Sequence, residues 1–292
     1  MYGKDSGSLK SYKTILSPIR GPNHVLEEYM QSMISVIIPT KNSGNTLQKL
    51  LYSLGRQTYR NFETIVFDNN SVDSTREIAE EMNSIVVNFG PERSAQRNKG
   101  AEIAKGEVLL FLESDMELTE HILEQCISGM STSDALCIME KVVAGDNYWA
   151  KARAFERDAY FGSLYFEAAR CFRKMVFNKL GGYDAGLTGL EDMALQAKLI
   201  EGGYRIGWID GAILHHEQDV GFSEYIKKRR LYGGTDKQFR DKFPEYWKRL
   251  QSPLLRSRVV LRHCARIGEP STLKYIPPIM LMRSAEFIAR RQ

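Results

Sequence analysis

Val108-Leu-Leu-Phe-Leu-Glu-Ser-Asp-Met-Glu117 joins a short apolar run to three carboxylates. A continuous apolar run of this length is typical of a buried strand. Glu113, Asp115 and Glu117 follow at a spacing of two, and alternate residues of an extended backbone point the same way. We therefore expect these carboxylates to converge where the strand leaves its sheet, where they would suit a hard cation such as Mg²⁺ or Mn²⁺. The alternative is a solvated acidic loop between a strand and a helix.

The segments before this stretch alternate between strand and helix patterns. Three runs rich in β-branched and aromatic residues predict strands at residues 34–39, 62–67 and 84–89. Apolar residues at helical spacing, or N-cap residues, predict helices at residues 45–57, 75–82 and 94–105. Strands that alternate with helices indicate a parallel α/β sheet with right-handed crossovers. Ligands of such sheets bind beyond the carboxyl ends of the strands, which is where the polar motifs of this chain lie.

The remainder of the chain has a more mixed pattern. We expect strands at 135–143 and 207–214, helices at 148–167 and 191–201, a turn at 181–184, and basic, aromatic helices past Phe222. An N-terminal extension, residues 1–32, is expected to hold one short helix at 24–31. The stretch 271–291 interleaves apolar residues with Lys and Arg, so it either packs on its own domain or lies on a membrane surface.

Charge is distributed unevenly along the chain. Residues 227–292 carry 17 Lys and Arg against 5 Asp and Glu, a net +12; from the totals of 40 and 36, the residues before them carry 23 against 31, a net −8. An acidic body with a basic tail suggests a metal site in the first part and an anionic ligand or surface near the second, although solvated helix faces would give the same count. The four cysteines are scattered, and we find no signal peptide and no apolar run of about 18 residues. We therefore expect reduced thiols in a cytoplasmic protein.

Five motifs in a fixed order resemble glycosyltransferase family 2. They are Ser35-Val-Ile-Ile-Pro-Thr-Lys-Asn42, Val66-Phe-Asp-Asn-Asn-Ser-Val-Asp-Ser74, Arg93-Ser-Ala-Gln-Arg-Asn-Lys-Gly-Ala101, Phe111-Leu-Glu-Ser-Asp-Met116 and Gly189-Leu-Glu-Asp-Met-Ala-Leu195, and His215 follows them. The resemblance covers residues 33–234. It implies the GT-A fold, a Rossmann-like mixed sheet with helices on both faces, here followed by a helical, basic C-terminal region at 235–292.

The resemblance also implies a role for each motif. Asp115 and His215 would hold a divalent metal, Mn²⁺ or Mg²⁺, and Asp192, with Glu191 beside it, would be the catalytic base. Glu113 stands where the family's DxD motif has its first Asp. The residues expected at the nucleotide sugar are Pro39, Thr40, Asn42, Asp68, Asn70, Arg97, Glu113, Ser114 and Asp115. Further candidates for contacts with the diphosphate or the acceptor are His216, Lys227, Lys228 and Tyr232, in a cationic cluster with Arg229 and Arg230.

Each of these residue types also has a purely structural explanation. Asp68 could form an Asx turn before the next helix. Arg97 could form a surface ion pair with Glu92 or Glu102. Glu191 and Asp192 could simply complement a helix dipole. Of His215 and His216, strand alternation lets only one point into a site, and we expect His215.

We therefore expect an inverting, metal-dependent glycosyltransferase. Its donor would be a nucleotide sugar, with a UDP-sugar favoured over a GDP-sugar, and its acceptor a hydroxyl of a glycan or a polyprenyl or other lipid-linked molecule. We expect no nucleic-acid partner, and a contact with an anionic membrane at its cytoplasmic face if the tail binds lipid. The rivals are a nucleotidyltransferase, which would carry a glycine-rich phosphate loop that residues 39–45 lack, and a non-catalytic sugar-nucleotide or glycan-binding protein.

Overall fold

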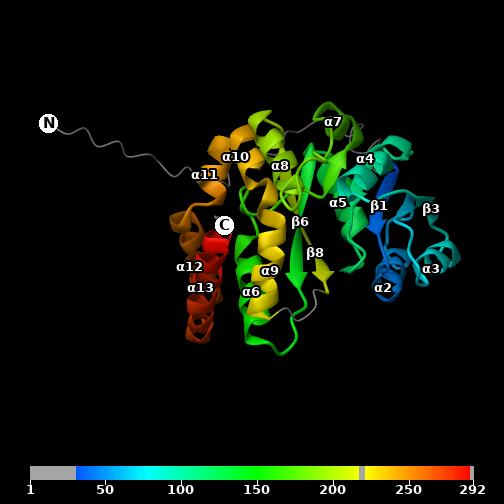
Figure 1. Cartoon of the computed structure of the whole chain (residues 1–292). Helices are drawn as coiled ribbons and strands as arrows, with labels where there is room; N and C mark the ends of the chain where they lie inside the picture. Colours follow the sequence, from blue (N-terminus) through cyan, green and yellow to red (C-terminus); the bar gives the residue numbers. More distant parts are fainter. Residues whose placement is uncertain (1–30, 217–220, 290–292) are drawn as a thin grey trace.

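Eight strands form one mixed sheet in the part of the chain that the computed structural model describes, residues 31–216 and 221–289. Their spatial order is β3-β2-β1-β4-β7-β6-β8-β5 (Figure 1). The strands are β1 (Ile34–Thr40), β2 (Phe62–Asp68), β3 (Ile85–Asn88), β4 (Val108–Phe111), β5 (Met116–Leu118), β6 (Ala135–Val142), β7 (Cys171–Arg173) and β8 (Ile206–His215). The first four strands are parallel, β7 runs antiparallel to both β4 and β6, and β5 runs antiparallel to β8. The expected mixed sheet is therefore confirmed.

Helices cover both faces of this sheet because β1 is apolar on both of its sides. Ile34, Val36 and Ile38 pack into one core with the residues of α2 and α5, whereas Ile37 packs into a second core with those of α4 and α8. The helices are α2 (Gly44–Gly55), α3 (Thr75–Glu81), α4 (Arg93–Ile103), α5 (Ile122–Met130), α6 (Tyr148–Tyr160), α7 (Lys174–Lys179), α8 (Glu191–Glu201), α9 (Phe222–Tyr232), α10 (Asp236–Lys242), α11 (Pro244–Leu250), α12 (Pro253–Ile267) and α13 (Ile276–Ala289), with 3₁₀ turns η2 (Gly233–Thr235) and η3 (Pro270–Tyr275).

The strand–helix alternation expected up to β4 is confirmed, and the differences come later in the chain. The elements β5, α5, β7 and α7 were not predicted. The strands β5 and β7 have three residues each, too few to show a periodicity, whereas α5 does carry apolar residues at helical spacing. The helix expected at 148–167 ends at Tyr160, because Phe161 is extended and Gly162 has a φ of +83°. The short helix expected at 24–31 lies outside the described residues, apart from Gln31.

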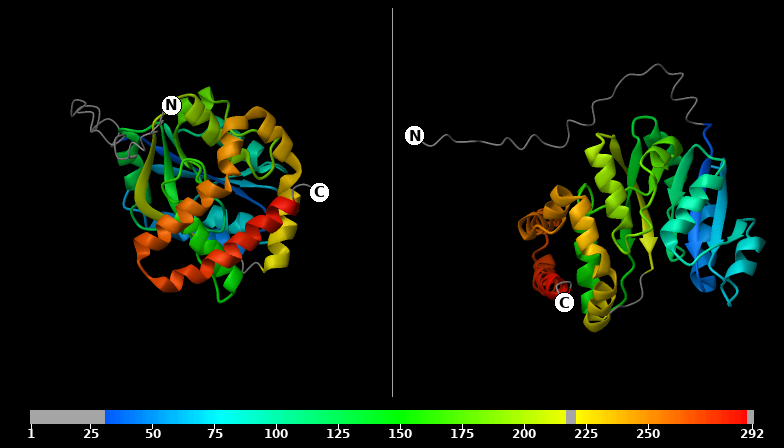
Figure 2. Two further views of the ribbon diagram at one scale, coloured as in Figure 1. Left: turned by 90° about the vertical axis from the view of Figure 1, so that its left-hand side faces the viewer. Right: turned by 45° about the horizontal axis from the view of Figure 1, so that its top comes forward.

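The C-terminal helices form a separate layer beyond α6. Figures 1 and 2 show α12 and α13 on the side of the molecule opposite β3 and α3. Phe155 of α6, Tyr225 of α9 and Val260 of α12 meet Ile279 and Met282 of α13 in one buried cluster. The stretch 271–291 thus packs on its own domain, which was one of the two expectations for it, although one face of α13 stays exposed. Among the described residues, no helix is long and apolar enough to cross a membrane.

Candidate active site

A cavity of about 700 Å³ opens beyond the carboxyl ends of β1, β4 and β8. Its volume is within the range of about 300–1,000 Å³ that small-molecule sites occupy. Charged and polar side chains dominate its lining. The lining residues are Asn42, Ser43, Thr46, Arg93, Arg97, Glu113, Ser114, Asp115, Glu140, Arg157, Ala168, Ala169, Arg170, Tyr183, Gly189, Glu191, Asp192, Met193, His215, His216, Glu224 and Arg229.

Arg97 of α4 lies at the centre of this cavity's wall and is buried. Its guanidinium donates to the carboxylate of Glu113 and to Glu191 Oε1, 3.3 Å away. The aromatic ring of Tyr183 lies beneath it, 5.2 Å from the guanidinium carbon. The surface ion pair with Glu92 or Glu102 is thus not what forms; the carboxylate of Glu92 instead caps α4. The predicted contact of Arg97 with the nucleotide stays a prediction.

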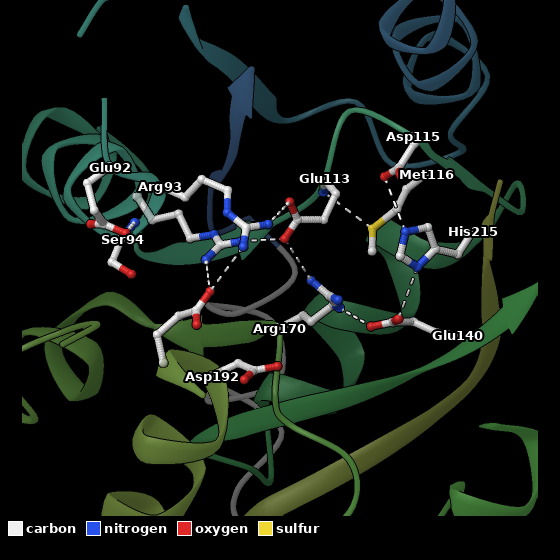
Figure 3. Close-up of polar contacts among 12 residues, drawn as sticks. Glu92, Arg93, Ser94, Glu113, Asp115, Met116, Glu140, Arg170, Asp192 and His215 are labelled. Atoms are coloured by element: carbon white, nitrogen blue, oxygen red, sulfur yellow. Dashed lines mark hydrogen bonds and ion pairs between the residues drawn. The ribbon is translucent and has the colours of Figure 1, made fainter. Parts of the chain in front are cut away.

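Arg170 continues the ion pairs across the sheet. The backbone N–H of Phe111 donates to the Arg170 carbonyl at 2.9 Å, and this strand pairing brings Arg170 beside Glu113, with 4.0 Å between the charged atoms. The guanidinium of Arg170 also donates to Glu140 of β6, which accepts a second bond of 2.5 Å from Arg157 of α6. Figure 3 shows the carboxylate of Glu113 facing Arg93 and Arg170. A series of alternating carboxylates and arginines therefore runs along the cavity, from Glu191 of α8 to Arg157 of α6.

These ion pairs control the charge of Glu113, which is partly buried, and of Glu140, which is buried. Burial would raise the pKa of Glu113, but Arg97, Arg170 and Arg93 outweigh it and lower the pKa to about 2. Burial likewise opposes the ionisation of Glu140, and its arginine partners hold the pKa of that carboxyl well below its ordinary value. Both acids are ionised at neutral pH and act as counter-ions for the arginines.

Asp115 lies in a different environment, beside His215 at the end of β8. The two side chains are 3.2 Å apart, and the other ring nitrogen of His215 lies 3.5 Å from Glu140. Burial would lower the pKa of His215, but the hydrogen bonds to Asp115 and Glu140 raise it to about 9. The imidazole therefore carries a proton at neutral pH in this state, and it must lose that proton before it can bind a metal.

Asp115 and His215 fit a partial site for a divalent metal. Mg²⁺ in proteins commonly takes one or two carboxylates and completes its coordination with waters and substrate phosphates. Within residues 31–216 and 221–289, no group of three or more His, Cys, Asp or Glu side chains is arranged to hold a metal. The protein would thus supply two ligands, and the remaining ones would come from the substrate and water.

The expected convergence of three carboxylates is wrong. Met116 N–H donates to the Glu113 carbonyl at 3.2 Å, so Ser114 and Asp115 form a turn rather than an extended strand. The turn sends Glu113 toward the arginines, and Glu117, on β5, instead bonds to His216 at 2.8 Å.

The prediction that strand alternation turns only one of His215 and His216 into the site is wrong. Both side chains line the cavity. The reason is that β8 ends at His215, so His216 no longer follows the strand's alternation. We expected His215 alone to point into the site, and His216 is a second imidazole at its edge.

Glu191 and Asp192 begin α8 on the far side of the cavity. Gly189, with a φ of +83°, turns the chain immediately before the helix. Asp192 accepts a hydrogen bond of 2.8 Å from the Met193 N–H, whereas Glu191 binds Arg97. Burial and the neighbouring charge of Glu191 raise the pKa of Asp192, against the opposing effect of Arg170. Figure 3 shows Asp192 and the Asp115–His215 pair on different sides of Arg170.

The residues expected to hold the nucleotide lie at the ends of β1 and β2. Asn42 lines the cavity, but Pro39, Thr40, Asp68 and Asn70 are not among its lining residues. Asp68 is buried and accepts hydrogen bonds from the backbone N–H and the hydroxyl of Ser71, which is the Asx-type arrangement considered as the alternative. The hydroxyl of Thr40 donates to the Phe67 carbonyl at 3.1 Å. Their nucleotide contacts stay predictions.

Several lining residues were not predicted from the sequence. Arg93 opens a quoted motif and is 45% exposed, which makes it the more accessible arginine of α4. Glu140, Arg157 and Arg170 come from elements that local sequence does not connect. Lys227 is exposed and outside the cavity lining, and the side chains of Lys228 and Tyr232 lie outside the described residues.

Comparisons with known proteins agree on one family. The model of the family described as Glycosyl transferase family 2 matches residues 35–184. The chain is 25% identical, over 240 residues, to a pre-mycofactocin glycosyltransferase of Mycobacterium tuberculosis, covering 75% of this chain and 48% of that protein. It is 28% identical, over 120 residues, to the GalNAc(5)-diNAcBac-PP-undecaprenol beta-1,3-glucosyltransferase of Campylobacter jejuni, covering 37% and 39%. The chain thus spans about half the length of the first relative, and less of the second.

Solved structures share the fold. S. aureus TarS 1-349 in complex with UDP-GlcNAc superposes with a TM-score of 0.54 at 19% identity, covering 89% of both chains. The mannosyltransferase PcManGT from Pyrobaculum calidifontis, in complex with GDP-Man and Mn2+, superposes with a TM-score of 0.58 at 16% identity, covering 89% of this chain and 86% of that chain. The expected GT-A fold is confirmed.

Replacing Glu113 tests whether the ion pairs stabilise the fold. Glu113→Gln leaves Arg97 and Arg170 without a shared counter-ion, and removing one partner of a buried pair typically costs about 3–5 kcal/mol. We expect the free energy of unfolding in urea to fall by roughly 3 kcal/mol, since part of Glu113 meets solvent. The control Glu80→Gln breaks an exposed pair with Arg76 and should leave the free energy of unfolding near that of the parent. Equal stability of the two variants would contradict a structural role for Glu113.

Proposed function

The chain belongs to glycosyl transferase family 2, and from this we propose that it transfers a sugar from a nucleotide-sugar donor to a hydroxyl of a glycan or lipid-linked acceptor. One observation carries the proposal. An arginine-lined cavity of about 700 Å³ has the Asp115–His215 pair on one wall and Asp192, with a raised pKa, on another. Such a cavity offers cations for a diphosphate and a carboxylate for an acceptor hydroxyl.

The donor we favour is a UDP-sugar. The TarS structure carries UDP-GlcNAc, and the PcManGT structure carries GDP-Man. In this proposal the loops after β1 and β2, with Asn42 and Asp68, bind the nucleoside. Arg93 is exposed in the cavity and donates to the diphosphate.

The leaving group is the nucleoside diphosphate, which gains negative charge as the anomeric bond breaks. Mn²⁺ or Mg²⁺ held by Asp115 and His215 would supply Lewis-acid stabilisation of that charge. The arginines of the wall act in the same direction, because they are fixed in place by Glu113 and Glu140 before the donor arrives. Such preorganised charge costs no reorganisation during the reaction.

Asp192 is the proposed base. Its carboxylate accepts the proton of the acceptor hydroxyl as the oxygen attacks the anomeric carbon opposite the leaving group, so the configuration inverts. A helix N-terminus would favour the ionised form, but burial and Glu191 raise the pKa of Asp192. A higher pKa makes the carboxylate a stronger base. Glu191 holds Arg97 and is a positioning residue.

Family membership favours this reaction over the two rivals. A nucleotidyltransferase would use a glycine-rich phosphate loop, whereas residues 39–45 lack that glycine density and lie within the range that matches the family. A non-catalytic binding protein has no use for a basic carboxylate at Asp192. We propose residues 33–234 as the transferase unit and 235–292 as an attached helical region.

Replacing Asp192 tests the proposed base. Asp192→Asn keeps the size of the side chain and removes its basicity, so we expect kcat to fall about 10²–10⁴-fold, roughly 3–5 kcal/mol of barrier. Donor affinity, measured by calorimetry, should stay near that of the parent. Glu201→Gln, at the other end of α8 and exposed, is the matched control and should leave kcat unchanged. Near-native turnover of Asp192→Asn at saturating substrates would show that another group takes the proton.

The pH dependence of kcat gives an independent test. A base with a raised pKa loses activity at a higher pH than an ordinary Asp, so the acid limb should lie above the usual range of that side chain. In Glu191→Gln the like charge is gone, the pKa of Asp192 falls, and the acid limb should move to lower pH. If the acid limb of the kcat profile moves to higher pH in Glu191→Gln, or does not move, Asp192 is not the titrating base.

Metal removal tests the role of Asp115. We expect donor binding to the parent to weaken when EDTA replaces Mn²⁺, and Asp115→Asn to bind the donor with the same affinity in both conditions. Glu117→Gln removes a nearby carboxylate outside the cavity lining and should keep the Mn²⁺ effect. An undiminished Mn²⁺ effect in Asp115→Asn, measured by calorimetry, would reject the metal-binding role.

A further inference from the structure

A second cavity, of about 690 Å³, lies between α12 and α13, and it shares no lining residue with the arginine-lined cavity. Its walls are largely aliphatic. The apolar side chains that line it include Val260, Leu261, Ile279, Met280, Phe287 and Ile288. A groove of this size and character suits an aliphatic chain rather than a polar ligand.

The charged residues at the base of this groove are already neutralised by one another. Arg283 donates two hydrogen bonds of 2.8 Å to Glu156 and one of 2.5 Å to Glu286. Glu286 also accepts from the hydroxyl of Tyr225 at 2.9 Å. These groups satisfy each other, and Arg256, which also lines the groove, donates to the Leu250 carbonyl and the Tyr160 hydroxyl. The groove therefore offers mainly apolar surface.

The outer face of α13 is uncharged. Its exposed residues between Ile276 and Ile288 are Pro277, Met280, Leu281, Ser284, Phe287 and Ile288. Met280 is 62% exposed and Ile288 61%, while Ile279 and Met282, on the opposite side of the helix, are buried against α6. A helix that is apolar on both faces normally has both faces covered. Contiguous exposed apolar surface of this kind marks an interaction site.

The neighbouring helix α12 adds positive charge to the same region. It contains four arginines and neither Asp nor Glu. Arg256 points inward to Tyr160, whereas Arg258, Arg262 and Arg266 are exposed. Leu254, 84% exposed, lies on this helix too. Apolar surface beside cations is the combination that binds anionic lipid bilayers.

A second copy of the chain fits this surface less well. A symmetric dimer brings the same patch of each protomer together. That arrangement would bring Arg258, Arg262 and Arg266 of both protomers into one interface, at a cost in like-charge repulsion. An anionic surface meets the same arginines with favourable charge.

We propose that α12 and α13 dock the protein on an anionic lipid bilayer. The exposed face of α13 enters the acyl-chain boundary, the arginines of α12 meet the lipid phosphates, and the groove between the helices takes an acyl chain. Figures 1 and 2 show this pair of helices at the outside of the molecule, where a flat bilayer can reach it. The docking surface is separate from the transfer reaction, and its test needs no sugar donor.

Vesicle sedimentation of the full chain tests the proposal. We expect binding to phosphatidylcholine vesicles that contain phosphatidylglycerol, and weaker binding to phosphatidylcholine alone. Binding should fall with added salt, because salt screens the arginines. The double variant Arg258→Gln with Arg262→Gln should bind about 25-fold more weakly, at about 1 kcal/mol for each arginine near the membrane and 1.4 kcal/mol per tenfold. Lys49→Gln with Arg76→Gln, exposed charges on α2 and α3, is the matched control and should bind like the parent.

Loss of apolar side chains tests the inserted face. Met280→Ser with Phe287→Ser should abolish the binding that persists at high salt, whereas Val72→Ser, at an exposed apolar residue remote from α13, should not. Thermal unfolding of all variants should match the parent, since every replaced side chain is exposed. Absence of vesicle binding at every ionic strength would overturn the proposal. So would a dimer in analytical ultracentrifugation that the Met280→Ser, Phe287→Ser variant dissolves, because the face would then belong to a second copy.

Discussion

A charge buried beside the cavity must have an opposite charge against it, and the arrangement of this protein follows from that requirement. An unpaired buried ion costs several kcal/mol, which is a large part of the stability of a typical domain. Glu113 meets Arg97 and Arg170, and Glu140 meets Arg170 and Arg157. These residues come from α4, the loop after β4, β6, α6 and the segment before β7. The ion pairs therefore hold the two halves of the sheet in one relative position.

The same requirement divides the acids of the cavity into two kinds. Glu113 and Glu140 are neutralised by arginines and keep those arginines in place. Asp192 instead accepts a backbone N–H, and Asp115 faces an imidazole that a metal could replace as its partner. Acids without an arginine partner are the ones that can bind a cation or accept a proton, because no arginine already neutralises their charge. In the proposed reaction, the acids of the family's motifs therefore divide into those that fix arginines in place, such as Glu113, and those that take part in the transfer, such as Asp192.

The uneven charge of the chain is also explained by where its side chains point. The basic tail is not one cationic surface. Arg256 and Arg283 turn inward to Tyr160 and Glu156, where they complete a buried polar cluster, whereas the outer arginines of α12 face solvent beside exposed apolar residues. The acidic body is balanced at the cavity by arginines of α4, α6 and the segment before β7. A net charge computed from composition could not separate these roles.

The sequence by itself determined the elements up to β4 and the family of the protein. Apolar runs and helical spacing are local properties, so they predicted the strands β1 to β4 with the helices between them and, later in the chain, β6, α8 and β8. The order of the motifs identified glycosyltransferase family 2. Only the tertiary structure decided which groups meet. The turn at Ser114 separates the three acids, and the antiparallel pairing of β7 with β4 and β6 brings Arg170 to Glu113 and Glu140. Strand pairing over long sequence separations sets such contacts, and no local pattern encodes the partner of a buried charge.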